Sequence, residues 1–152
     1  MTARPATRTT RRFTYDGLGF PVVLHNVPMV RVRGKWTPLI DYDALARRVL
    51  LALARKPARL TGSEIRFIRL SFEMTLGAFG ARFDVSHPAV LKWERVGHGP
   101  PSLKWPVEKD IRLFILDRLG ARPAAFKALY DALREAASAT PGPLEIDVGA
   151  AA

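Results

Sequence analysis

The chain has 152 residues, no cysteine and a formal net charge of +10 at pH 7. The lack of cysteine excludes disulfides, cysteine zinc sites and thiolate nucleophiles, and no run of 18 apolar residues is available for a membrane-spanning helix. The length allows a domain with a buried core, and the positive charge favours a polyanionic partner, with nucleic acid ahead of a membrane surface.

Most of the positive charge lies in the N-terminal part, where residues 1–60 contain 12 Lys and Arg against 3 Asp and Glu. Residues 1–12 contain four arginines among Thr, Ala and Pro and nothing apolar to bury. This composition predicts a flexible basic arm. The alternative for the charge is a solvated basic surface without a partner.

Residues 13–58 predict a small α+β segment. Apolar residues punctuated by glycine and proline indicate strands in its first half, and His25-Asn26 is the expected turn of a hairpin. Basic and apolar side chains alternate over residues 29–35, so one face of this strand is expected to be basic. A helix over about residues 42–55 follows.

Residues 59–139 predict a domain of five helices. The first begins at Thr61, because a threonine followed three residues later by Glu64 has the pattern of a capping box. Thr75 caps a short second helix, and a three-residue turn ending at Ser86 leads into a third helix through about Arg95.

Two further helices, over residues 106–119 and 123–138, complete the predicted domain, separated by a glycine and a proline. The tail, residues 140–152, contains one short apolar run, which is either a lone edge strand or disorder. We expect disorder. The fold class that these elements predict is mainly α: a five-helix domain preceded by a small segment of β-hairpin plus helix.

Two helices joined by a three-residue turn have the spacing of a helix-turn-helix. On the third helix, Val90 and Trp93 lie on the stripe that must face the core, so Trp93 is expected to be a core residue and no stacking platform. The opposite stripe carries basic and apolar side chains and no acid: Pro88, Leu91, Lys92 and Arg95. Such a face suits a groove lined with phosphates and thymine methyl groups.

Residues 60–94, LTGSEIRFIRLSFEMTLGAFGARFDVSHPAVLKWE, resemble the lambda-repressor/Cro-like (XRE) family of helix-turn-helix transcription regulators, and a looser match continues to Leu119. The order LTGSEIRFIR…WE is similar to the DNA-binding domain of antitoxins from toxin–antitoxin systems. Those antitoxins often carry a cysteine-based zinc domain, which a chain without cysteine does not have. The sequence also has Leu76 where the family has a phosphate-binding glutamine, and Gly80 where it has alanine.

The resemblance implies a five-helix lambda-repressor-like domain in which Arg69 pairs with Glu94. The positions that read bases in the family are His87, Pro88 and Lys92 here, and two of these also lie on the outward stripe. Ser86 either binds phosphate or only caps its helix. Contacts to the DNA backbone are expected from Ser86, Arg95, Lys104, Arg11 and Arg12.

We therefore expect a sequence-specific double-stranded DNA-binding transcriptional regulator, a repressor or autoregulator of the bacterial cytoplasm or nucleoid, that reads the major groove with helix 86–95. The three histidines lack metal-ligand spacing and no catalytic motif is present, so no enzyme, metal or cofactor is expected. One alternative is an antitoxin-like protein whose N-terminal segment also binds a toxin-like protein partner. The other is a non-specific architectural DNA binder. Surplus apolar residues over 106–138 predict a homodimer.

Overall fold

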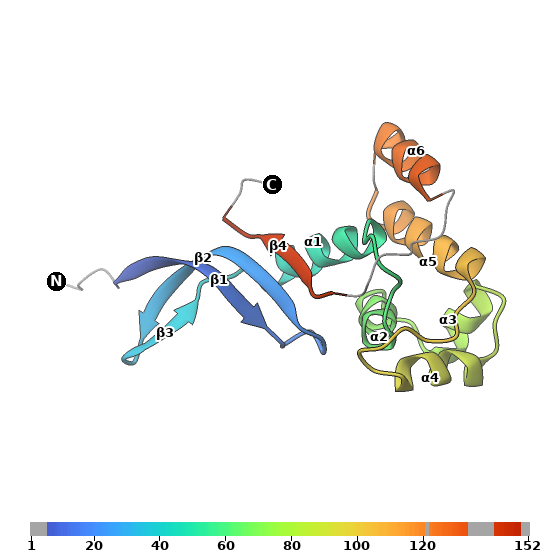
Figure 1. Cartoon of the computed structure of the whole chain (residues 1–152), viewed down its shortest axis with the longest axis horizontal. Helices are drawn as coiled ribbons and strands as arrows, with labels where there is room; N and C mark the ends of the chain where they lie inside the picture. The colour runs from blue at the N-terminus through green and yellow to red at the C-terminus, as the bar shows by residue number, and fades with distance from the viewer. Residues whose placement is uncertain (1–5, 121, 134–141, 150–152) are drawn as a thin grey trace.

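The computed structural model describes residues 6–120, 122–133 and 142–149, and Figure 1 shows a sheet at one end of the long axis and a group of helices at the other. In chain order the elements are β1 (Thr7–Tyr15), β2 (Val22–Val32), β3 (Lys35–Pro38), α1 (Tyr42–Ala54), α2 (Gly62–Ser71), α3 (Leu76–Arg82), α4 (His87–Arg95), α5 (Trp105–Arg118), α6 (Pro123–Ala132) and β4 (Leu144–Asp147).

The prediction of a mainly α fold with a five-helix domain is wrong, because the described residues contain a four-stranded mixed sheet beside their six helices, where only a small hairpin was expected. Strand β2 lies at the centre of the sheet. The antiparallel strand β1 pairs with residues Val22–Val30 of β2. Two further strands pair with different parts of β2: antiparallel β3 with Met29–Val32, and parallel β4 with Val22–His25. The long β2 therefore organises strands from both ends of the chain.

The predicted hairpin turn at His25-Asn26 is also wrong, because β2 continues through both residues. Asn26 has a φ of 55°, a left-handed conformation that asparagine tolerates better than most residues. Leu24 and Val27, on either side of it, are both fully buried although they are three residues apart. Asn26 thus interrupts the alternation of buried and exposed side chains along β2, at the position where a turn was expected.

Two segments predicted to be unstructured belong to the sheet. Residues 7–12, predicted as part of a flexible arm, form the first two thirds of β1, and residues 144–147, predicted as part of a disordered tail, form β4. The strand β1 is rich in Thr and Arg because most of its side chains are exposed, whereas Leu144 and Ile146 of β4 are buried. Residues 1–5, 140–141 and 150–152 of the predicted arm and tail lie outside the described residues.

Helix α1 joins the sheet to the other helices (Figure 1). Asp41 caps it by accepting a hydrogen bond from the amide of Ala44, and its apolar stripe contacts β4 on one side and α5 on the other. Val27 of the sheet, Leu53 of α1 and Ile115 of α5 belong to one hydrophobic cluster. The predicted boundary between residues 58 and 59 therefore does not separate two cores.

Helix α5 is surrounded within the chain. Its apolar residues Ile111, Ile115 and Leu116 are fully buried, and it packs against both α1 and α6. Of the surplus apolar residues from which a homodimer was predicted, Leu116 is covered by the chain itself, Leu113 is half-buried and Tyr130 of α6 is exposed, so the homodimer stays a prediction. Helix α6 ends at Ala132, earlier than predicted, and residues 134–138 of the predicted helix lie outside the described residues.

Candidate nucleic-acid interface

The tight turn between α3 and α4 fixes where α4 begins. Asp84 has a left-handed backbone (φ 55°), and the amide of Val85 donates to the carbonyl of Gly80 at 2.9 Å. A Cβ atom at Gly80 would lie 2.6 Å from the carbonyl oxygen of Val85, so this turn needs glycine at that position. The Ser86 hydroxyl then accepts from the amide of Ala89 at 3.2 Å and caps α4.

The other end of α4 is held by the start of α2. The loop after α4 offers the carbonyls of Gly97 and Gly99 to the amides of Ser63 and Gly62, at 2.9 and 3.2 Å. These amides belong to the first turn of α2, where no carbonyl of the same helix can accept from them. A Cβ atom at Gly62 would lie 2.2 Å from the carbonyl oxygen of Trp93, so the two backbones are in close contact. The loop after α4 thus holds the end of α4 against the start of α2.

The structure brings the predicted partners Arg69 and Glu94 together as a bidentate ion pair. Arg69 donates from Nε and Nη2 to the two carboxylate oxygens at 2.8 and 2.9 Å, and from Nη1 to the carbonyl of Met74 at 2.9 Å. The side chains are only 11% and 7% exposed. Hydrogen bonding to Glu94 raises the pKa of Arg69, in line with a charge-assisted pair. This pair ties the end of α4 to the end of α2.

The outward face of α4 is basic and contains no acid. Val90 and Trp93 are buried, as the spacing predicts, while Leu91 is half-buried. The remaining predicted site residues of the helix are exposed: His87, Pro88, Lys92 and Arg95. Figure 1 shows α4 along the outer edge of the helical end of the molecule, with α2 and α3 on its inner side. A helix in this position can approach an external groove without obstruction by neighbouring helices.

The other predicted backbone contacts do not all lie near α4. Lys104 is exposed at the start of α5 and makes no side-chain cap there. Arg11 and Arg12 lie on β1 of the sheet, and Arg12 lines a cavity between the sheet and the start of α2. Arg12 is 3.4 Å from the carboxylate of Glu145. The structure therefore groups the predicted residues of α4 on one helix and places the two arginines of the predicted arm on the sheet.

Sequence reasoning missed a buried ionic network centred on Glu108. This carboxylate accepts from Arg59 at 2.8 Å and from Arg112 at 2.8 and 3.1 Å. Arg112 also donates to the carbonyls of Lys56 and Ala58, in the connection between α1 and α2. Burial lowers the pKa of Arg112, and the adjacent Glu108 carboxylate opposes that shift. The spacing of four residues within α5 is the one local signal for this pair.

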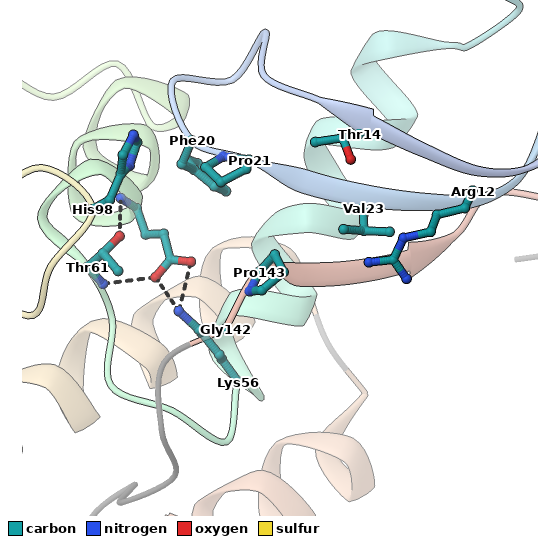
Figure 2. A pocket seen from close by; sticks show the side chains of 11 residues that line it. Arg12, Thr14, Phe20, Pro21, Val23, Lys56, Thr61, His98, Gly142 and Pro143 are labelled. Carbon is teal, nitrogen blue, oxygen red and sulfur yellow. Dashed lines mark hydrogen bonds and ion pairs between the residues drawn. The ribbon is translucent and has the colours of Figure 1, made fainter.

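A cavity of about 380 Å³ lies between the sheet and the start of α2. Figure 2 shows Thr61 and His98 on one side of it and Arg12 on the other. At its base, Lys56 donates to both oxygens of Glu64 at 2.8 and 3.0 Å, and the carboxylate also accepts from the amide of Thr61. The Glu64 carboxylate is thus fully engaged in capping and pairing and is not available as a general base.

The described residues contain no group of three or more His, Cys, Asp or Glu side chains that could hold a metal ion. Among the same residues, no helix is both long and apolar enough to cross a membrane. Comparison of the chain with protein-family models, with curated proteins and with solved structures found no match.

Proposed function

We propose that this chain is a sequence-specific double-stranded DNA-binding protein that regulates transcription and reads the major groove with α4. The observation that carries the proposal is the basic, acid-free outward face of a helix whose two ends are fixed by the protein. A rigid scaffold matters because base contacts require side chains to be held in register with base edges. The major groove is wide enough for such a helix.

Each exposed residue of α4 has a role suited to its chemistry. The ammonium group of Lys92 can donate to guanine O6 and N7, and the imidazole N–H of His87 can donate to the same acceptors. Pro88 has no donor, so its contact with a thymine methyl group would be apolar. Arg95 and Lys104 extend the positive charge towards backbone phosphates.

Replacing Lys92 tests base reading by α4. Lys92→Ala is expected to weaken binding to a duplex selected from random DNA by about 1–3 kcal/mol and to relax the preference at one base pair. Folding should not change, because Lys92 is exposed. The measurement is fluorescence anisotropy with a series of duplexes that each carry one base-pair change.

Lys127→Ala is the matched control, because it removes the same charge from an exposed position on α6. Its affinity and base preference should stay close to those of the wild type. If Lys92→Ala lowers affinity equally for every sequence in the series, Lys92 contacts phosphate and the proposed reading is contradicted.

A further inference from the structure

The end of the sheet farthest from α4 carries a concentration of positive charge on the β2–β3 hairpin. Arg31 of β2 and Trp36 of β3 are opposite each other in the ladder, and the guanidinium of Arg8 lies 4.2 Å from the centre of the Trp36 ring. Arg33 lies in the turn, and Lys35 follows the turn as the first residue of β3. We define these four cationic residues with Trp36 as the basic hairpin.

The turn of the basic hairpin distributes its charges around the tip. Arg33 and Gly34 both have positive φ values, 50° and 78°, and form a two-residue loop, as in type I′ hairpins. Lys35 is opposite Val32, whereas Arg31 is opposite Trp36, so the two cations project from opposite faces of the ribbon. The predicted single basic strand face is therefore wrong, and the tip presents positive charge in several directions.

These cations have no ion-pair partner within the part of the chain that the structure describes. No carboxylate there lies within ion-pair distance of Arg8, Arg31, Arg33 or Lys35, in contrast to Arg12 beside Glu145. All four cationic side chains are exposed. Like charges gathered without counter-charges repel one another, and a polyanion at this surface would relieve that repulsion.

We propose that the basic hairpin is a second DNA contact, which binds backbone phosphates of the duplex beside the segment that α4 reads. This inference rests on the proposed function. Figure 1 looks down the shortest axis of the molecule. In this view the hairpin tip and α4 lie at opposite ends of the longest axis, and both lie along the lower side. One duplex running along this side can therefore reach both. The contact is independent of base sequence, because phosphates carry no sequence information.

The test is a triple variant, Arg31→Gln, Arg33→Asn and Lys35→Gln, in which asparagine suits the left-handed backbone at position 33. Binding is measured at several salt concentrations on two selected duplexes of about 30 and about 12 bp, roughly 100 and 40 Å long at 3.4 Å per step. On the long duplex the slope of log K against log salt should fall by roughly 2–3, at about 0.9 per lost phosphate contact. On the short duplex, which offers fewer phosphates beyond the segment at α4, the slope should fall less.

A second triple variant, Arg55→Gln, Arg122→Gln and Lys127→Gln, removes the same net charge from exposed positions outside the hairpin. It should retain the wild-type slope on both duplexes. Equal slopes for the wild type and the hairpin variant on the long duplex, or equal losses for the two triple variants, would overturn the second contact while leaving α4 as the reader. No binding of either duplex by the wild type would overturn the proposed function as well.

Discussion

Glu108→Gln is expected to lower the free energy of unfolding by about 3–5 kcal/mol, the loss typical of a buried ion pair deprived of one partner. Glu108 and Arg112 are each 1% exposed, and the carboxylate forms ion pairs with both Arg112 and the half-buried Arg59. Glutamine keeps the size of the side chain but leaves the Arg112 charge buried without a counter-charge. Chemical denaturation monitored by tryptophan fluorescence measures the loss.

Asp110→Asn is the matched control, because it makes the same chemical change two residues away on α5. Asp110 is 47% exposed and lies 3.4 Å from Arg82, which is also exposed. An exposed pair of this kind contributes about 0–1 kcal/mol. If Glu108→Gln and Asp110→Asn had the same small effect, the network around Glu108 would not hold the α1–α2 connection to α5.

Arg69→Met is expected to lower the free energy of unfolding by about 3 kcal/mol or more, because it leaves the buried Glu94 carboxylate without its bidentate partner. Binding to the selected duplex should also weaken, since Glu94 fixes the end of the helix proposed to read the bases. Thermal unfolding and anisotropy on the same samples measure the two effects.

Arg66→Met provides the comparison, because Arg66 lies 3.9 Å from the same carboxylate but is 65% exposed. Its removal should change stability by less than about 1 kcal/mol. A melting temperature unchanged by Arg69→Met would show that the pair does not hold α4 in place.

The helices around α4 could be predicted because their signals are local. Thr61 and Glu64 form the capping box that their spacing indicated, and Thr75 and Ser86 cap α3 and α4 through bonds to amides three residues ahead. The outward face of α4 followed from helical periodicity alone. The partnership of Arg69 with Glu94 joins two helices, and it came from the resemblance to a known family.

The sheet could not be predicted in the same way, because its pairing joins residues far apart in the chain. Thr7 lies opposite Val30, and Leu144 lies beside Val22, with nothing in the local sequence to indicate either partner. Strand β1 is mostly exposed on both faces and therefore lacks the apolar alternation that identifies a strand. The sequence predicts a turn at Asn26, because asparagine favours the left-handed conformation of turns, but Asn26 adopts that conformation inside a strand.

The buried charges were missed for a related reason. Glu108 and Arg112, read as a sequence, look like an ordinary solvated pair on one helix face. Their burial depends on α1 and its connection to α2 lying over α5, which only the tertiary fold determines.

The central claim, that α4 reads base sequence, is tested most directly by one competition measurement on the wild-type protein. A duplex selected from random DNA competes with a duplex of the same length and base composition in scrambled order, at two salt concentrations. We expect the protein to bind the selected duplex about 10³-fold or more tightly than the scrambled duplex, and this ratio of affinities should persist at the higher salt concentration. Equal affinities for the two duplexes, both falling steeply with salt, would contradict base reading by α4 and show that charge alone carries the binding.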